Sequence, residues 1–340
     1  MRDGFTLGEG WHHRRGEPHA EVEALLDARR RRTPVRGATA YVSLEPCNHH
    51  GRTPPCSEAL IASGIARVVI GARDPNPKTA EGGIRRLREA GIPVEQLALP
   101  QAAGLIVPFR WTIAQPLPFV TLKMAMSLDG YIATRASRQH WLTGAAARER
   151  VRELRAAHDA VMVGAGTVRV DNPQLTVRPY ATRRKPYTRV VVCETDTIAP
   201  DSSVLAPPAD APKGTYRPTI VLAPAGARRR FAALEARADV VYVGGEAETQ
   251  LDLREAMLAL RAREITTVLC EGGPTLAGRL LEHGLVQRAL WLVAPVFLRA
   301  NGAVPALAGA AMPGNGWIVT GTERVGDDVL VATQLACSPD

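Results

Sequence analysis

Apolar positions in the first part of the chain follow two different spacings. Short apolar runs bounded by turn residues predict buried strands at 41–44 and 67–71. Apolar residues three and four positions apart predict amphipathic helices at 19–30, 57–63 and 84–90. Strands that alternate with helices are typical of an α/β fold with a largely parallel sheet. Active residues of such folds lie at the carboxyl ends of strands.

The second part of the chain repeats this alternation. Its strand candidates lie at 119–126, 160–163, 188–193, 219–223, 240–243, 267–270, 289–296 and 328–335. The proline-rich stretch 199–218 is expected to be an exposed loop. Prolines flank a stretch without periodicity at 112–118, which predicts a linker between an α/β domain at 1–111 and another at 119–340.

Composition agrees with two such domains. The chain has 340 residues, 46% of them hydrophobic, which is enough for two ordinary cores. It contains no run of about 18 uncharged apolar residues, the length that a membrane-spanning helix needs. Its first residues carry neither an apolar signal segment nor a cleavage site. We therefore expect no membrane partner and a location in the cytoplasm.

The formal net charge of +8 comes mainly from arginine, because lysine occurs only at 78, 123, 185 and 213. A basic balance can indicate nucleic acid, but the arginine runs 29–32 and 228–230 lie at expected helix ends without interleaved aromatic residues. We expect these charges to serve solvation or phosphorylated small substrates, and no nucleic acid as partner. The five cysteines are too unevenly placed for a disulfide framework.

Four residues in the first part supply the components of a catalytic zinc site. His19, Cys47 and Cys56 offer one imidazole and two thiolates, the ligand set of a zinc ion with an open fourth position. Glu21 need not bind the metal, and H-x-E followed by P-C and a second cysteine is the signature of zinc-dependent nucleobase deaminases. Zinc would lower the pKa of bound water towards about 7 and so supply hydroxide to replace a ring amine. Glu21 would carry the proton to the ring nitrogen and then to ammonia.

Two other interpretations of these residues remain open. One is a structural zinc site, which needs a fourth ligand such as His49 or His50. The other is a pair of buried free cysteines with an unrelated surface histidine. The interval between Cys47 and Cys56 is longer than the usual two-residue gap, so spacing alone does not decide, and the glutamate of H-x-E favours catalysis.

Four motifs in this part belong together. They are Pro18-His19-Ala20-Glu21, Leu44-Glu45-Pro46-Cys47, the segment from His49 to Cys56 that includes Arg52, and Asp74-Pro75-Asn76-Pro77. These motifs closely resemble the deaminase half of the bifunctional riboflavin biosynthesis protein family, and the resemblance extends over nearly all of the chain. It implies a cytidine-deaminase-like three-layer domain, with Arg52 at the substrate. That domain would deaminate 2,5-diamino-6-(ribosylamino)pyrimidin-4-one 5'-phosphate, and a second domain would reduce the ribosyl group to ribityl with NADPH.

Two strand-to-helix turns in the second part are suited to a dinucleotide. One runs through Gly164-Ala165-Gly166-Thr167 after strand 160–163, and the other through Glu271-Gly272-Gly273-Pro274-Thr275 after strand 267–270. Glycines let backbone amides approach a phosphate, and a helix start adds positive potential. Neither turn has a full G-x-G-x-x-G, which argues against a standard Rossmann site, and each turn alone is equally consistent with simple chain reversal.

Three further motifs accompany these turns, namely segment 122–130, Trp141-Leu142-Thr143-Gly144 and segment 171–178. Together they resemble the reductase half of the same family, whose fold is like that of dihydrofolate reductase. The resemblance implies NADPH contacts from Ala125, Trp141, Thr167, Asp171, Gly273, Pro274, Thr275, Leu276, Ala277 and Gly278. It implies substrate contacts from Gln139, Arg155, Leu175, Arg178 and Glu271. Arginines suit a ribose phosphate and a carboxylate suits sugar hydroxyls, although a solvated helix position is the alternative for Arg155.

The chain departs from the family pattern in three places. Gln139 stands where the family commonly has serine, and Cys193-Glu194 stands where it commonly has Asp-Ser, so that Glu194 is expected to repel a cofactor phosphate. The chain also begins at the family strand that residues 5–11 represent, after the helix, strand and Pro-Asn-Pro loop of the family's deaminase half. We expect an uncovered sheet edge there and poor deamination by protein that starts at Met1.

Three hypotheses follow from the sequence. The main one is a bifunctional zinc deaminase and NADPH-dependent reductase that can form homo-oligomers. The second is a reductase with a vestigial deaminase domain, which the expected missing elements favour. The third, from another class, is a non-enzymatic nucleic-acid-binding module on the basic surface, whose RNA binding would fall steeply with salt.

Overall fold

The computed structural model describes residues 1–13, 16–51, 53–77, 79–97, 99–134, 141–177, 185–298, 302–309 and 316–336. The chain forms two compact units, Met1–Gln115 and Pro116–Asp340. A helix that the sequence pattern did not predict, α4 (Pro100–Ala114), ends the first unit, with Pro108 in its interior. The expected linker at 112–118 therefore begins inside a helix, and the prolines around it had disguised the helical stretch.

The first unit contains a three-stranded sheet in the order β1-β2-β3, with both strand pairs parallel. Its elements are β1 (Thr39–Val42), β2 (Arg67–Ile70), β3 (Val94–Gln96), α1 (Ala20–Arg30), α2 (Cys56–Ala62) and α3 (Gly82–Glu89). Apolar side chains of β2 pack with Leu60 of α2 and with Ile84 and Leu87 of α3 in one core. The parallel α/β layer that the pattern predicted is therefore present.

The strand expected at 5–11 is not formed. Residues 6–11 pair with no strand, and the only ladder-like contact of this stretch is an isolated bridge between Arg2 and Phe5. The stretch instead runs close along α1, because a side chain at Gly8 would come within 2.7 Å of Ala28. This stretch therefore packs closely against α1, which glycine permits, and does not pair with the sheet.

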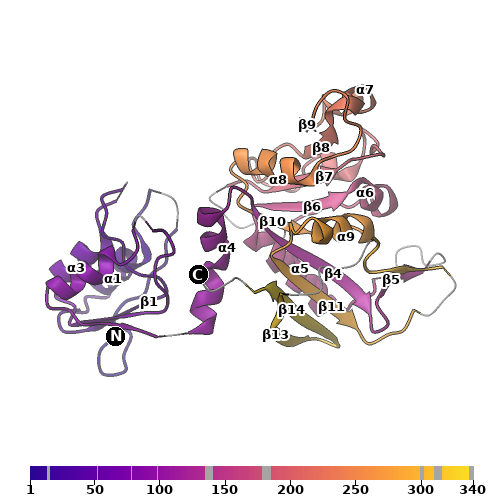
Figure 1. Cartoon of the computed structure of the whole chain (residues 1–340). Helices are drawn as coiled ribbons and strands as arrows, with labels where there is room; N and C mark the ends of the chain where they lie inside the picture. Colours follow the sequence, from indigo (N-terminus) through magenta and orange to yellow (C-terminus); the bar gives the residue numbers. More distant parts are fainter. Residues whose placement is uncertain are drawn as a thin grey trace. The chain divides into compact units, whose positions relative to one another are not determined.

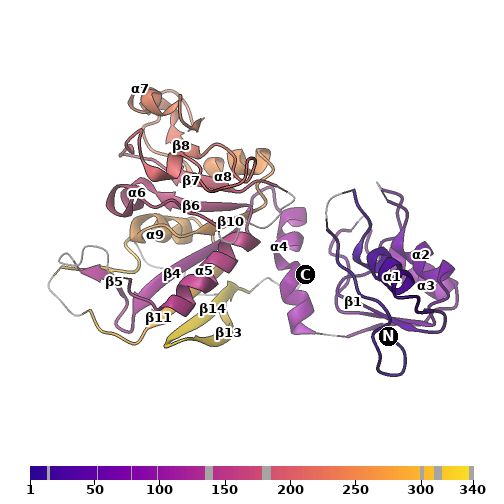
Figure 2. The ribbon, with the colours of Figure 1, turned by 180° about the vertical axis from the view of Figure 1, so that it is seen from behind.

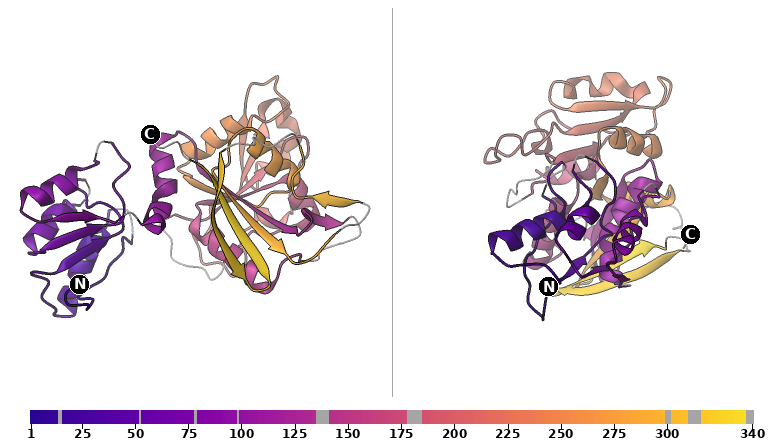
Figure 3. Two further views of the ribbon diagram at one scale, coloured as in Figure 1. Left: turned by 60° about the horizontal axis from the view of Figure 1, so that its bottom comes forward. Right: turned by 90° about the vertical axis from the view of Figure 1, so that its left-hand side faces the viewer.

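The second unit is built on a nine-stranded sheet in the order β13-β14-β11-β4-β10-β6-β7-β8-β9. The strands are β4 (Phe119–Ser127), β6 (Ala160–Gly164), β7 (Thr188–Val192), β8 (Ile220–Pro224), β9 (Asp239–Val243), β10 (Thr267–Cys270), β11 (Arg288–Ala294), β13 (Trp317–Val325) and β14 (Asp328–Leu335). From β11 to β9 all neighbours are parallel, and the hairpin of β13 and β14 adds an antiparallel edge (Figure 3). All eight predicted strands are present.

The pattern missed β13 and the small two-stranded sheet of β5 (Tyr131–Thr134) and β12 (Ala303–Pro305). Most residues of β13 are exposed, so its sequence lacks the alternation of a half-buried strand.

Helices cover both faces of the large sheet. They are α5 (Ala145–Ala157), α6 (Ala165–Asp171), α7 (Arg228–Phe231), α8 (Leu253–Ala262) and α9 (Pro274–Glu282), with short 3-10 turns at Ser203–Leu205, Ala225–Ala227 and Ala232–Leu234. Helix α9 lies in front of the sheet in Figure 1, and α5 lies in front of it in Figure 2. On β4, Leu122 and Met124 face the core under α8 and α9, so Lys123 points to the α5 face.

The proline-rich segment 199–218 has no regular structure apart from the 3-10 turn, as predicted. It is not simply an exposed loop, however. Val204 is fully buried and Leu205 is 8% exposed, and both belong to the core on the face of α6 and α7. The segment is therefore part of the packed unit.

Candidate functional site

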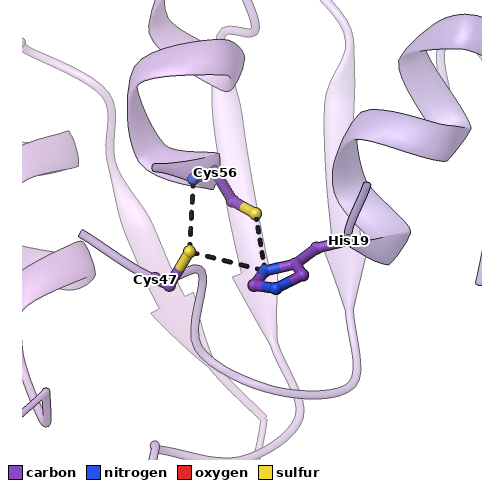
Figure 4. A group of neighbouring side chains, drawn as sticks. All are labelled: His19, Cys47 and Cys56. Atoms are coloured by element: carbon purple, nitrogen blue, oxygen red, sulfur yellow. Dashed lines mark hydrogen bonds between the residues drawn. The ribbon is translucent and has the colours of Figure 1, made fainter. Parts of the chain in front are cut away.

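The three predicted metal ligands come together at one edge of the first unit. His19 immediately precedes α1, Cys47 follows β1, and Cys56 opens α2, and their side chains point toward one another (Figure 4). The Nδ1 atom of His19 lies 3.5 Å from the Sγ atom of Cys47 and 3.3 Å from that of Cys56. Tetrahedral zinc with usual bond lengths holds neighbouring N and S ligands about 3.6 Å apart. The donor set and its spacing therefore fit zinc.

The pKa values of the two cysteine thiols are shifted in opposite directions. The backbone N–H of Cys56 donates to the sulfur of Cys47 at 3.4 Å. The hydrogen bond from the Cys56 thiol, helped by that amide and by His19, lowers the pKa of Cys47 to about 5. The same bond and burial raise the pKa of Cys56. Cys47 is thus ready as a thiolate, and a cation on both sulfurs would replace the proton of Cys56.

Glu21 lies beside the ligands without being one of them. It stands in the first turn of α1, and its side chain is hydrogen-bonded to Cys56. Burial, with a smaller contribution from the Cys47 thiolate, raises the pKa of the Glu21 carboxyl. The ligand atoms of His49 and His50, which are both described, do not join the cluster. The arrangement therefore leaves a carboxyl group free to handle protons next to three ligands.

A cavity of about 170 Å³ opens onto these ligands. It is lined by His12, Gly16, His19, Cys47, His49, Gly51 and Thr53. His12 stands edge-on to the His19 ring at 5.1 Å, and its Nδ1–H donates to the carbonyl oxygen of Pro18 at 3.0 Å. The sequence interpretation missed His12, although a histidine pair just before H-x-E was a usable signal. Arg52, predicted at the substrate, lies outside the described residues.

Glu45 lies two residues before Cys47 and anchors the loop that carries this ligand. It is 5% exposed, and its carboxylate accepts hydrogen bonds from the backbone N–H groups of Asp74 and Ile84, both at 3.3 Å. A side chain at Gly83 would overlap the carbonyl oxygen of Pro46, so only glycine allows α3 to approach this loop. The contacts of Glu45 therefore favour a role in positioning the loop that carries Cys47.

In the second unit, two predicted substrate residues form a buried ion pair with each other. Arg155 donates to Glu271 from Nε at 2.5 Å and from Nη2 at 2.9 Å, and from Nη1 to the carbonyl oxygen of Thr176 at 3.0 Å. Burial opposes both charges, yet their attraction keeps the pKa of Glu271 below and that of Arg155 above its usual value. The solvated alternative for Arg155 is wrong. Its contacts favour a role in holding Glu271 and Thr176.

Lys123 is a third charged residue of this cluster, and the sequence interpretation did not predict it as a site residue. It lies on β4 next to Glu271, since its neighbour Leu122 pairs with Cys270. Burial lowers the pKa of Lys123, while the Glu271 carboxylate opposes that shift. A lysine inside an otherwise apolar strand was the available signal, because such a charge needs a buried partner.

The two glycine turns lie side by side. Strands β6 and β10 are parallel neighbours, and a side chain at Gly273 would lie 3.4 Å from the hydroxyl of Thr167. Gly273, Pro274 and Thr275 open α9 and are accessible to different degrees. Leu276 and Ala277 are buried in the main core, so only their backbone can reach a cofactor. The paired turns fit a dinucleotide that contacts backbone amides.

The remaining predicted residues of this unit have varied surroundings. Trp141 is 78% exposed and lies 5.3 Å from the guanidinium of Arg148, Ala125 packs partly against α5, and Asp171 ends α6 at the surface. Leu175 is only 4% exposed, so a substrate contact from it would come from its backbone. Gln139 and Arg178 lie outside the described residues.

Glu194, which the sequence predicts to repel a cofactor phosphate, has a positively charged partner in the structure. Its carboxylate forms an ion pair with Arg279 of α9, one turn after Leu276. The pair is locally neutral, so the carboxylate does not face a cofactor as an isolated negative charge.

Comparison with known proteins agrees with both sites. Residues 118–331 match the RibD C-terminal domain, and residues 1–72 match the zinc-binding region of cytidine and deoxycytidylate deaminases. The riboflavin biosynthesis protein RibD of Escherichia coli K12 is 38% identical over 315 residues, which cover 88% of this chain and 81% of that protein. The chain belongs to the RibD family. The family that the sequence motifs resembled is thus confirmed.

Solved RibD structures extend the likeness to the fold. Acinetobacter baumannii RibD, form 1, has a TM-score of 0.76 at 32% identity and covers 98% of this chain and 90% of its own. A Thermotoga maritima deaminase/reductase has a TM-score of 0.75 at 29% identity, with the same coverage. The cytidine-deaminase-like and dihydrofolate-reductase-like classes predicted for the two RibD halves are confirmed. No helix among the described residues is long and apolar enough to cross a membrane.

Proposed function

We propose that the chain is a bifunctional enzyme of riboflavin biosynthesis. Its first half would deaminate 2,5-diamino-6-(ribosylamino)pyrimidin-4-one 5'-phosphate, and its second half would reduce the ribosyl group of the product to ribityl. The Thermotoga maritima relative is described as a diaminohydroxyphosphoribosylaminopyrimidine deaminase and 5-amino-6-(5-phosphoribosylamino)uracil reductase. The observation that carries the proposal is the convergence of His19, Cys47 and Cys56 in a chain that also has a RibD C-terminal domain.

In the deaminase half, His19, Cys47 and Cys56 would hold zinc, which makes a water molecule acidic enough to serve as a nucleophile near neutral pH. Glu21 would move protons beside it, first to a ring nitrogen and then to the departing ammonia. Glu45 keeps Cys47 in place through two backbone amides. The cavity beside His12 would take the pyrimidine, with Arg52 at the substrate.

In the reductase half, NADPH would supply the hydride, and the protein would contribute placement and electrostatics. Thr167, Asp171 and the accessible backbone between Gly273 and Gly278 would bind the cofactor, together with Ala125 and Trp141. Glu271, held by Arg155, would accept hydrogen bonds from the substrate, and Lys123 would offer it a cation. Leu175 and Arg178 stay predicted substrate residues, as does Gln139.

The bifunctional hypothesis is better supported than a reductase with a vestigial deaminase half. A vestigial domain would be under no requirement to keep three ligands and a carboxyl group together, yet His19, Cys47, Cys56 and Glu21 form one cluster. The zinc-binding region also matches its family as a sequence. The cytoplasm as compartment, and homo-oligomer formation, stay predictions.

The test is to assay the two half-reactions separately on purified protein of known metal content. We expect one zinc per chain, ammonia release from the diaminopyrimidine substrate, and NADPH oxidation with the deaminated intermediate. Removal of zinc with a chelator should stop only the first reaction. Zinc-containing protein that reduces the intermediate but releases no ammonia would establish the reductase-only hypothesis instead.

A further inference from the structure

The segment 172–177, between α6 and the predicted substrate residue Arg178, is held in an unusual conformation. Asn172 and Leu175 have left-handed backbones, with φ angles of 39° and 50°. A left-handed leucine is uncommon and persists only where its surroundings impose it. Leu175 is buried among side chains that include Val204 and Leu205 of the proline-rich segment 199–218.

Both ends of this segment are tied to the same proline-rich segment. At one end, Asn172 Oδ1 accepts a hydrogen bond from the backbone N–H of Ser203 at 2.8 Å. At the other end, the backbone N–H of Val177 donates to the hydroxyl oxygen of Tyr216 at 3.0 Å. Between these two hydrogen bonds, the carbonyl oxygen of Thr176 accepts a hydrogen bond from Nη1 of Arg155. The other two guanidinium nitrogens of Arg155 donate to Glu271. The segment thus connects the proline-rich segment to the charged cluster of the reductase half.

Tyr216 is itself fixed in place. Its neighbours bracket Tyr187, whose N–H donates to Thr215 at 2.8 Å and whose carbonyl accepts from Arg217 at 2.9 Å. Below the ring, the guanidinium of Arg189 lies 4.8 Å from the ring centroid, on a side chain that is 1% exposed. A cation under the ring and backbone bonds on both sides leave the hydroxyl little freedom. Tyr216 therefore offers the Val177 amide a rigid acceptor.

We propose that Tyr216 is a positioning residue of the reductase half. It holds segment 172–177 against Arg155, so that the Arg155–Glu271 pair and the backbone around Leu175 meet the phosphorylated substrate in one fixed arrangement. This inference rests on the proposed reductase function. The proline-rich segment, which lies outside the site, would thereby fix the shape of the side of the site that binds substrate.

The test is the substitution Tyr216→Phe, which keeps the ring over Arg189 and removes the acceptor for Val177. We expect the KM for 5-amino-6-(5-phosphoribosylamino)uracil to rise about three- to tenfold, the effect of losing one hydrogen bond, with kcat, the KM for NADPH and deamination within about twofold. Asn172→Gly keeps the left-handed backbone, removes the tie to Ser203 and should raise the same KM. The matched control is Tyr242→Phe, which removes a hydroxyl bonded to Glu235 elsewhere in the unit and should leave KM unchanged.

Hydrogen–deuterium exchange provides a readout that does not depend on activity. The Val177 amide should exchange faster in Tyr216→Phe than in wild type, and at the wild-type rate in Tyr242→Phe. Unchanged exchange would show that Tyr216 does not hold the segment. Faster exchange with an unchanged KM, or an equal rise of KM in Tyr242→Phe, would overturn its role at the site. If wild-type protein reduces no substrate, the proposed function fails, and the exchange rates still decide whether Tyr216 holds the segment.

Discussion

The two halves of the chain build their sites in different ways. In the deaminase half, every ligand atom is a side-chain atom from a short stretch between His19 and Cys56. In the reductase half, the charged cluster and the glycine turns come from strands and helices between Lys123 and Gly273, and they meet because β4, β10 and β6 are neighbours in one sheet. The first site is defined by residue types, and the second by topology.

The two sites also differ in how their charges are balanced. In the deaminase half, the thiol protons of Cys47 and Cys56 compete with a cation for the sulfur atoms. The Glu21 carboxyl adds a third acidic group beside them. In the reductase half, the Glu271 carboxylate has its counter-charges within the protein, in Arg155 and Lys123. We therefore expect the first site to depend on a metal ion, whereas the charged cluster of the second site is held together by protein groups alone. Removal of single charges from each site tests this difference.

The largest effect is expected from Cys56→Ala. With one sulfur removed, two ligands remain, and zinc should be lost together with all measurable deamination. Reduction should stay within about twofold of wild type, because the second unit has its own sheet and cores. Metal analysis and the two separate assays measure this. Cys193→Ala, at a buried cysteine of the second unit, is the control and should keep its zinc. Full zinc content in Cys56→Ala would remove Cys56 from the ligand set.

Glu21→Gln should lower the rate of deamination by about 10²–10⁴-fold, the usual value of a positioned acid or base. Zinc should stay bound at one per chain, because Glu21 is not among the three ligand atoms. The glutamine keeps the shape of the side chain and its hydrogen bond near Cys56 while removing the proton carrier. Loss of zinc from this variant would make Glu21 a ligand and refute its assigned role.

The same contrast explains how far the sequence could be interpreted. The zinc ligands were predictable because few chemistries require a histidine, two cysteines and a nearby glutamate at such spacing. The parallel strands were predictable because buried strands are continuous apolar runs, and all seven parallel strands of the large sheet were found, together with the antiparallel β14. Exposed β13 and proline-containing α4 carry no such pattern and were missed.

Other features depended on contacts that no local pattern records. The pairing of Arg155 with Glu271 and of Glu194 with Arg279 joins residues far apart in the chain, so the sequence alone predicts Arg155, Glu271 and Glu194 as separate charges toward a ligand. The burial of Leu276 and Ala277 follows from which side of α9 faces the sheet. The strand at 5–11 was expected from the family resemblance, and no local pattern records that this stretch packs closely on α1 instead.

Glu271→Gln tests whether the reductase cluster balances its own charge. Arg155 and Lys123 would face each other without a carboxylate, and the free energy of unfolding of the second unit should fall by about 3 kcal/mol at pH 7. The attraction of Arg155 lowers the pKa of Glu271 despite its burial, so its stabilisation is present above its ordinary pKa of 4.5 and is lost as pH falls through the lowered value. Wild type and variant should therefore converge in stability below pH 4.5. Denaturant unfolding across this range measures the effect.

A matched control for that experiment is Glu149→Gln, which breaks an exposed ion pair with Arg152 on α5. It should change the free energy of unfolding by less than about 1 kcal/mol, with no special dependence on acid pH. Equal effects of the two substitutions would mean that the Arg155–Glu271 pair behaves as a surface pair. The charge balance of the reductase cluster would then be unimportant for its stability.

The smallest effect is expected from Glu194→Ser, which tests whether the neutral pair at the cofactor turns matters for recognition. Without its partner, Arg279 becomes a cation without a counter-charge from Glu194, one turn along α9 from Leu276 and still bonded to the carbonyl oxygen of Leu251. The KM for NADPH should fall about two- to fourfold, the effect of one screened surface charge on a nearby phosphate, while the KM for NADH should change less. Asp239→Ser, which removes the carboxylate partner of Arg263 at the amino end of β9, away from the glycine turns, is the control and should shift both values less. If the ratio of the two KM values is the same in Glu194→Ser as in wild type, the extra phosphate of NADPH lies away from Arg279, and the departure at Glu194 does not bear on cofactor choice.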